Sequence, residues 1–385
     1  MNTPSLYWDI FCTVVDNHGD IGVAWRLARQ LAREYGFPVR LWADDLSAFQ
    51  RICPEISPAR SVQCVMNVEI RMWDKNSAGT CFPLGAPPAN IVIETFGCRA
   101  PDSYSRAMAS VSPQTIWINL DYLSAEAWVE TCHMLPSPHP RLPQAEYFFF
   151  PGFTEKTGGL LRERGLEKDA RDFLNSPERK AILWKTLGFT VPAQGTQTFF
   201  LFAYENTAIP GLLDFLAAGD APVRCLVPPC ESNEKIFRSI ALSGKTLSRG
   251  RLELCFLTAF VPQTEFDALL LISDFLFIRG EDSFVRSQWA ERPFVWNIYP
   301  QERRAHFSKL DAFLDLYCEN LSHEASKAVR AFHQEWNKGF FSPETCADWM
   351  ACLPDLRVHA KNWAEHLKKQ DDLCRSLVKF CLSKL

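Results

Sequence analysis

The chain has 385 residues, of which 47% are hydrophobic and 22% are charged, so it is long and apolar enough to form two hydrophobic cores. This composition excludes a disordered chain, a collagen-like repeat and a small disulfide-stapled scaffold. The 45 acidic and 41 basic residues give a formal net charge of −4, which lacks the basic excess that a general nucleic-acid binder needs.

Short apolar runs alternate with amphipathic segments in the first half of the chain, a pattern typical of α/β units with a parallel sheet. The first strand is expected at Trp8–Val15 and the first helix at Val23–Tyr35. The turn-rich segment Leu135–Pro140 and the polar segment Thr154–Gly159 predict the end of a first domain. Further strands are expected at Val39–Ala43, Asn90–Glu94 and Thr115–Leu120.

The second half of the chain repeats the same alternation. We expect a first domain over 1–155, a second over 160–358, and a last helix, about 360–385, that returns to the first domain. In two such doubly wound, Rossmann-like halves, a ligand is expected between them at the carboxyl ends of the strands. Strands are expected at 198–204, 223–227, 252–257, 274–278 and 294–297, and helices at 263–271, from 283 to 290, and through a tail from about 322.

The 14 cysteines are scattered through apolar stretches without a Cys-x-x-Cys pair, so we expect neither a zinc ribbon nor a redox pair. His133 and His139 lack a third ligand at metal spacing, and no metal cofactor is expected. The apolar stretches fall well short of the roughly 18 residues of a membrane span. No signal peptide is visible either, so we expect a cytoplasmic protein.

The loop between the first strand and the first helix, Asp16–Gly22, is acidic. Asp16 and Asp20 would repel a pyrophosphate, and the Gly-x-Gly-x-x-Gly fingerprint is absent, so the loop suits a cationic or proton-donating ligand. Gly19 and Gly22 would allow a tight turn and a close ligand approach. The alternative is that Asp20 caps the helix, and the loop alone does not decide between the two.

A second loop at a strand end, Arg279–Ser283, suits an anionic ligand instead. Arg279 can bind a phosphate with its forked guanidinium, and Ser283 with the helix-start N–H groups would complete an anion site. Glu281 and Asp282 could hold sugar hydroxyls or a cationic co-substrate. The alternative is a capping box with a surface ion pair, worth about 0–1 kcal/mol. We favour a functional site, because this is the second acidic loop of this kind in the chain.

Other strand ends offer aromatic and polar candidates. Phe260 and the backbone at Val261 could hold a flat base. Tyr299 and Gln301 could reach a nucleotide, and Phe202–Asn206 would line the same cleft. Isolated aromatic residues more often belong to the core, and that alternative stays open.

Several of these segments together resemble one family over nearly the whole chain, the elongation factor P arginine rhamnosyltransferases (EarP). Asn297 departs from the pattern, since His would be expected there in many relatives. The resemblance is carried by Phe11–Gly22, Trp25–Arg29, Leu41–Asp45, Asn119–Glu126, Phe202–Glu205, Arg279–Ala290 and Pro293–Gln301.

The resemblance implies a GT-B fold whose C-terminal domain binds dTDP-β-L-rhamnose and whose N-terminal domain binds elongation factor P. It implies transfer of rhamnose, with inversion, to one arginine of that factor, which then helps ribosomes stalled at proline runs. It implies no metal or other cofactor, and we expect neither nucleic acid nor a membrane as a direct partner. Two alternatives remain: a GT-B enzyme that uses a UDP-sugar on a glycan or lipid, and a non-catalytic protein that binds a translation factor.

The resemblance also assigns residue roles. Asp16 and Asp20 would lie at the reaction centre with Asp20 as the base, and Glu281 would join them from the donor side. This agrees with the chemistry, because a protonated guanidinium is a poor nucleophile and a carboxylate can orient it and accept its proton. The donor would contact Asn17, Gly19, Tyr204, Phe260, Gln263, Arg279, Asp282, Ser283 and Tyr299.

Overall fold

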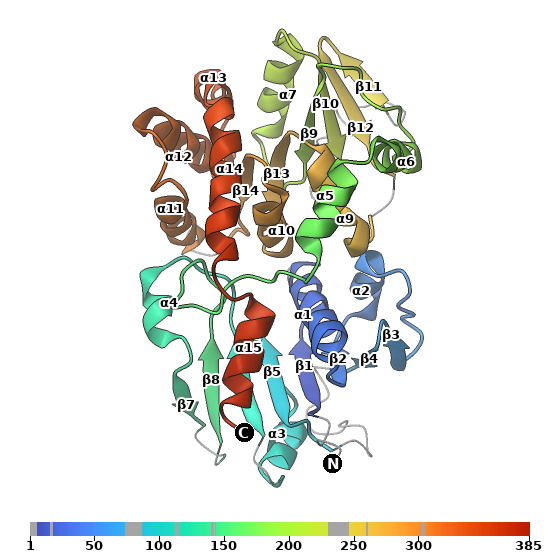
Figure 1. Ribbon diagram of the computed structural model, residues 1–385, viewed down its shortest axis with the longest axis vertical. Helices are drawn as coiled ribbons and strands as arrows, with labels where there is room; N and C mark the ends of the chain where they lie inside the picture. The colour runs from blue at the N-terminus through green and yellow to red at the C-terminus, as the bar shows by residue number, and fades with distance from the viewer. Residues whose placement is uncertain are drawn as a thin grey trace. The chain divides into compact units, whose positions relative to one another are not determined.

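The chain divides into two compact units in the computed structural model (Figure 1). The first unit combines Met1–Arg164 with Leu367–Leu385, and the second is Gly165–His366. The sequence analysis placed the first boundary between residues 155 and 160. The structure describes residues 6–15, 18–73, 87–111, 115–139, 142, 144–229, 246–258, 261–301 and 305–385.

The described part of the first unit contains an eight-stranded sheet in the order β3-β4-β2-β1-β5-β6-β8-β7. The six inner strands run parallel, and the two edge strands pair antiparallel with their neighbours. Every residue of the central strands is buried, which explains why they read as continuous apolar runs. The strands are β1 (Trp8–Cys12), β2 (Val39–Ala43), β3 (Val62–Val65), β4 (Val68–Met72), β5 (Ile91–Thr95), β6 (Ile116–Leu120), β7 (Pro136–Pro138) and β8 (Ala145–Phe149).

The last helix, α15 (Leu373–Leu382), packs within the first unit, far in sequence from the strands it covers (Figure 1). Phe380 lies with its ring centroid 5.2 Å from that of Tyr147. Asp372, the N-cap of this helix, accepts a 3.0 Å hydrogen bond from the side chain of Gln30 in α1. The other helices of this unit are α1 (Gly19–Tyr35), α2 (Leu46–Ile52), α3 (Asp102–Met108) and α4 (Ala127–Cys132).

The described part of the second unit contains a six-stranded sheet in the order β11-β12-β10-β9-β13-β14, with only the edge strand β11 antiparallel. Its strands are β9 (Gln197–Leu201), β10 (Val223–Val227), β11 (Thr246–Arg249), β12 (Leu252–Phe256), β13 (Phe275–Arg279) and β14 (Phe294–Asn297). Its helices are α5 (Leu166–Leu174), α6 (Pro177–Leu187), α7 (Ile209–Ala218), α9 (Gln263–Ile272), α10 (Asp282–Ala290), α11 (Ala305–Tyr317), α12 (His323–Asn337), α13 (Pro343–Ala351) and α14 (Leu353–Lys368).

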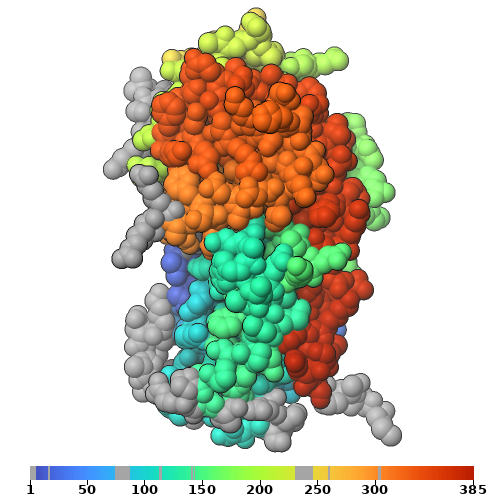
Figure 2. Space-filling model, turned by 90° about the vertical axis from the view of Figure 1, so that its left-hand side faces the viewer, coloured from blue at the N-terminus to red at the C-terminus, as the bar shows by residue number. Residues whose placement is uncertain are grey.

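Aromatic side chains fill the space between this sheet and its helices. Phe284 of α10 stacks on Trp296 of β14 with ring centroids 3.8 Å apart, and Phe313 of α11 meets the same Trp296 edge-on. Phe277 of β13 lies 4.6 Å from Trp336 of α12. Helices α11–α13 form the orange surface of this unit in Figure 2. The contact between Phe277 and Trp336 packs the end of α12 against β13.

The first expected strand and the first expected helix differ from the structure at their boundaries, and the strand expected at 198–204 ends at Leu201. The first strand ends at Cys12 rather than Val15, and α1 begins at Gly19 rather than Val23. The two glycines of the loop suggested a turn, but Gly22 is buried in the helix and donates its N–H to the His18 carbonyl at 2.9 Å. Gly19 and Gly22 therefore serve the first turn of a helix, and the predicted tight turn at them is wrong.

The segment expected to be turn-rich, Leu135–Pro140, contains the three-residue strand β7. Strand β7 forms an edge of the sheet, where the missing N–H group of proline is tolerated. The prolines suggested a turn because proline disfavours a strand inside a sheet. They do not exclude an edge strand.

Gly159 and Gly36 provide a matched test of backbone packing in the first unit. Both have positive φ, +74° and +69°, but a Cβ at Gly159 would lie 2.2 Å from the carbonyl oxygen of Asp371, whereas nothing lies within 4 Å at Gly36. We expect Gly36→Ala to cost about 1 kcal/mol of folding free energy from φ alone. Gly159→Ala should cost at least about 2 kcal/mol more because the backbone must move. Urea unfolding measures both, and equal costs would contradict the close approach.

Candidate active site

Each sheet has one position where successive connections leave in opposite directions. In the first sheet it lies between β1 and β5, and in the second between β9 and β13. Ligands of open α/β sheets bind at the carboxyl ends of the strands at such a switch point. The predicted residues Asp20 and Arg279 belong to segments at these positions, Asp20 after β1 and Arg279 as the last residue of β13.

Asp20 lies in the first turn of α1 and is 3% exposed. Its Oδ2 accepts a hydrogen bond from the backbone N–H of Val15 at 2.9 Å, which fixes the carboxylate against the loop that leaves β1. The N-cap residue is His18, so the alternative that Asp20 caps the helix is wrong. A carboxylate in the first turn is also favoured by the helix dipole. Gly19 is half-buried beside it, and Asp16 and Asn17 lie outside the described residues.

The surroundings of Asp20 include groups that sequence reasoning did not single out. Asp44, just after β2, accepts the backbone N–H of Val14 at 2.8 Å, so a second carboxylate holds the same loop. Burial raises the pKa of the Cys12 thiol, and the negative charges of Asp20 and Cys98 add to that rise. Cys12 therefore stays protonated and is no nucleophile.

Arg279 lies between two aromatic rings at the switch point of the second sheet. Its guanidinium carbon is 4.4 Å from the ring centroid of Phe202 and 4.9 Å from that of Tyr204. Tyr204 meets Tyr299 edge-on at 5.4 Å. Gly280, with φ of +66°, turns the chain directly after the strand. The structure therefore brings together three of the predicted donor residues, from three different strand ends.

Asp282 and Gln263 are also brought together. The Gln263 side chain donates to Asp282 Oδ2 at 3.0 Å, and Arg286 donates to the same oxygen at 3.0 Å. Arg286 pairs in addition with Asp267 at 2.8 Å, which ties α9 to α10. The side chains of Asp282 and Arg286 are 14% and 3% exposed, so this ion pair is largely buried.

The remaining predicted residues differ in burial and in their contacts. Ser283 is buried, and its hydroxyl donates to the carbonyl of Arg279, within the first turn of α10. Glu281 is the N-cap residue, and among the described residues its side chain makes no capping hydrogen bond, so the alternative of a capping box is wrong. Tyr299 is 40% exposed. Phe260 lies outside the described residues.

A family model described as the elongation factor P (EF-P) rhamnosyltransferase EarP matches residues 8–382. The chain belongs to the EarP family. The protein-arginine rhamnosyltransferase of Pseudomonas aeruginosa is 42% identical over 380 residues, which cover 97% of this chain and 98% of that protein. The corresponding enzyme of Neisseria meningitidis serogroup B is 34% identical over 95% of this chain and 92% of its own length.

Solved structures agree with this membership of the EarP family. A structure reported as the structural basis for EarP-mediated arginine glycosylation of EF-P matches with a TM-score of 0.69 and 31% identity, and covers 99% of this chain and 100% of that one. A UDP-glucosyltransferase from Polygonum tinctorium shares the fold at 11% identity, with a TM-score of 0.53 and 99% of each chain covered. The predicted α/β fold of GT-B type and the predicted enzyme, a protein-arginine rhamnosyltransferase that acts on EF-P, are confirmed.

The described residues contain no group of three or more His, Cys, Asp or Glu side chains placed to hold a metal ion. Within the same residues, no helix is both long enough and apolar enough to span a membrane.

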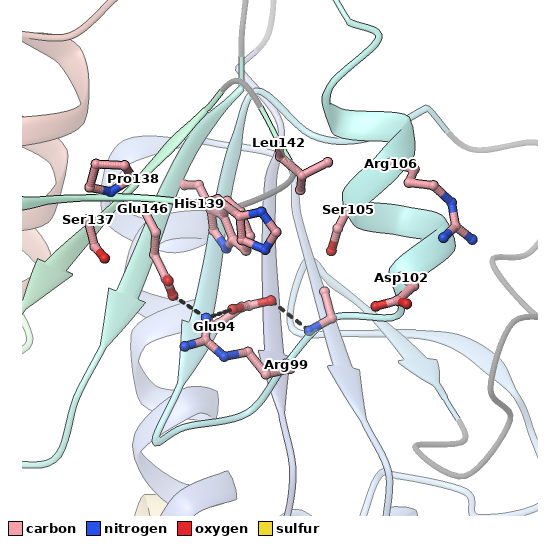
Figure 3. Close-up of a pocket in the computed structure, with 12 residues that line it drawn as sticks. Glu94, Arg99, Asp102, Ser105, Arg106, Ser137, Pro138, His139, Leu142 and Glu146 are labelled. Atoms are coloured by element: carbon pink, nitrogen blue, oxygen red, sulfur yellow. Dashed lines mark hydrogen bonds and ion pairs between the residues drawn. The ribbon is translucent and has the colours of Figure 1, made fainter.

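A pocket of about 530 Å³ in the first unit contains none of the predicted site residues (Figure 3). At its base, Arg99 donates to Glu94 at 2.9 Å and also to Glu146, and the Ala100 N–H donates to Glu94 at 2.6 Å. Burial raises the pKa of Glu94 from 4.5 to about 7, against the opposing effects of the Ala100 N–H and Arg99. The other residues of the lining are Asp102, Ser105, Arg106, Trp117, Ser137, Pro138, His139 and Leu142.

This raised pKa predicts a pH dependence of stability. Between about pH 4.5 and 7 the folded protein binds more protons at Glu94 than the unfolded chain does, so Glu94 reduces the free energy of unfolding as the pH rises through this window. Glutamine at this position does not titrate. We therefore expect the stability of Glu94→Gln relative to the wild type to increase from pH 4.5 to 8 by up to a few kcal/mol. Unfolding at a series of pH values measures it, and a constant difference would refute the prediction.

Proposed function

We propose that this chain transfers L-rhamnose from dTDP-β-L-rhamnose to one arginine of EF-P and inverts the anomeric centre. Membership in the EarP family supports the sugar and the acceptor. The observation that carries the donor side is the Arg279 guanidinium held between Phe202 and Tyr204 at the switch point of the second sheet. In this proposal the first unit binds EF-P and the second binds the nucleotide sugar.

Asp20 is the base of the proposed reaction. The arginine side chain is protonated at neutral pH, with a pKa above about 12, so one nitrogen must lose a proton as it attacks the sugar. The Val15 N–H fixes one oxygen of the Asp20 carboxylate, which gives the base a defined orientation. The nitrogen forms a bond to the anomeric carbon, its proton passes to Asp20, and the bond from that carbon to the diphosphate oxygen breaks. Asp16 would assist by attracting the cationic acceptor.

Arg279 has the complementary task of stabilising the diphosphate as it leaves. Negative charge increases on the leaving group in the transition state, and a preoriented cation lowers the barrier more than a mobile one. The two flanking rings fix the plane of the guanidinium. The start of α10, directly after Gly280, adds the positive end of a helix dipole. Glu281, the N-cap of this helix, would bind the sugar or the incoming guanidinium.

The other residues would shape the nucleotide site. Tyr204 and Tyr299 form an aromatic corner beside Arg279. The contact with Asp282 holds Gln263 at the start of α9, where its amide would bind the nucleotide. Asn17, Gly19, Phe260 and Ser283 remain donor residues by resemblance alone. We also propose a cytoplasmic location, because ribosomes and their elongation factors work there.

Intact-mass measurement of EF-P tests the proposed reaction. Incubation with this chain and dTDP-β-L-rhamnose should add one deoxyhexose to one arginine. Asp20→Asn keeps the shape of the side chain and an oxygen for the Val15 N–H, but it loses the basicity, so the rate should fall by about 100-fold or more. Asp102→Asn is the matched control, because Asp102 is an exposed first-turn residue of α3, and it should keep full activity. Full activity of Asp20→Asn would support a non-catalytic role instead.

Thermal unfolding tests the identity of the donor. A ligand that binds only the folded protein stabilises it by about 2.7 kcal/mol at 100 times its Kd. We expect dTDP-β-L-rhamnose to raise the unfolding temperature and UDP-glucose to leave it unchanged at the same concentration. Equal shifts from the two would contradict the donor assignment and favour a GT-B enzyme that uses UDP-sugars.

A further inference from the structure

Asn337, the last residue of α12, uses the full hydrogen-bonding capacity of its amide. Its oxygen accepts from the backbone N–H of Ile298 at 3.0 Å and from the side chain of Asn297 at 3.3 Å. Its nitrogen donates to the carbonyls of Trp296 at 2.7 Å and His333 at 2.9 Å. One side chain therefore joins the end of a helix to the segment that leaves β14.

Asn297 extends this connection to the segment that follows β9. It is the last residue of β14 and is 6% exposed. Its oxygen accepts the backbone N–H of Tyr204 at 2.9 Å, while its nitrogen donates to Asn337. Two consecutive side-chain amides thus link the end of α12 to the backbone of Tyr204, across 133 positions of sequence between 204 and 337.

The segment after β9 is fastened to the same helix end at further points. The Asn206 side chain donates to the carbonyl of Trp336 at 2.9 Å, and the Thr207 hydroxyl donates to the carbonyl of Gly339. Gly339 has φ of +69°, and a Cβ there would lie 2.6 Å from Thr207 Oγ1. The approach is close enough that the backbone of Tyr204 and its neighbours has little freedom to shift.

The residues that this network holds are those that surround Arg279. Tyr204 forms one of the two rings against the guanidinium, and its other neighbour is Tyr299. Asn337 fixes the backbone of Tyr204 indirectly, through Asn297. It fixes the backbone of Ile298, the residue before Tyr299, directly. A loss of the Asn337 amide would free both backbones at once.

We propose that Asn337 is a positioning residue of the nucleotide-sugar site, which acts through Asn297 and Ile298 to hold Tyr204 against Arg279 and Tyr299 against Tyr204. This inference rests on the proposed function, in which those three residues bind the donor. A purely structural role, in which Asn337 only completes α12, would change stability and leave donor binding of the folded protein intact.

Calorimetric titration with dTDP, together with steady-state kinetics, separates these two roles. We expect Asn337→Ala to raise the Kd for dTDP and the KM for dTDP-β-L-rhamnose by about ten-fold. The Ile298 N–H loses its acceptor, and Asn297, which accepts from the Tyr204 N–H, loses the acceptor that holds its own amide. The KM for EF-P should stay unchanged. Lys338→Ala is the control, since Lys338 is exposed and lies one residue further along, and it should bind dTDP as the wild type does.

A second variant covers the case in which Asn337→Ala does not fold. Asn297→Ala leaves Asn337 bonded to Ile298, Trp296 and His333 and removes only the link to Tyr204. We expect it to weaken dTDP binding in the same direction. Wild-type affinity for dTDP in a folded Asn297→Ala or Asn337→Ala variant would overturn the inference. A wild-type protein that binds no dTDP would instead refute the proposed function.

A double-mutant cycle adds a test of the route. If Asn337 acts through Tyr204, then Asn337→Ala should change dTDP affinity less in a Tyr204→Ala background than in the wild type. If Asn337→Ala changes the Kd for dTDP by the same factor in both backgrounds, the route through Tyr204 is wrong.

Discussion

The reversal of strand order in each sheet is the constraint on which the candidate site depends. Connections leave β1 and β5 on opposite sides in the first sheet, and β9 and β13 do the same in the second. No crossover helix covers the carboxyl ends of such a strand pair, so the segments that follow them are left to bind ligands. This is why Tyr204 and Arg279 meet although 75 positions separate 204 from 279.

The side chains at the two switch points carry opposite charges. Near Asp20, two carboxylates accept hydrogen bonds from backbone N–H groups of the loop that leaves β1, Asp20 from Val15 and Asp44 from Val14. Around Arg279, the guanidinium lies over the rings of Phe202 and Tyr204, which contact it without adding a negative charge of their own. In the proposed function, the acidic loop would bind the guanidinium of the acceptor and Arg279 would bind the diphosphate of the donor.

The sequence predicted fully buried strands well and exposed edge strands poorly. Val39–Ala43, Val223–Val227 and Phe294–Asn297 match the observed β2, β10 and β14, because strands buried on both faces are unbroken apolar runs. The hairpin β3–β4 was missed. Its turn places Met66 and Asn67 at φ of 50° and 64°, and neither a glycine nor a long apolar run marks it.

The position of Asp20 after β1 and of Arg279 at the end of β13 could be predicted from the sequence. A role that depends on a distant partner could not. Nothing local distinguishes Asn337 from an ordinary polar residue at a helix end. Asn297 shows the same limit, because the family resemblance led us to expect His there. Its amide accepts from Tyr204 and donates to Asn337. A neutral imidazole also offers one acceptor and one donor, so either residue can complete the connection, and the requirement is for that pair of atoms rather than for a particular side chain.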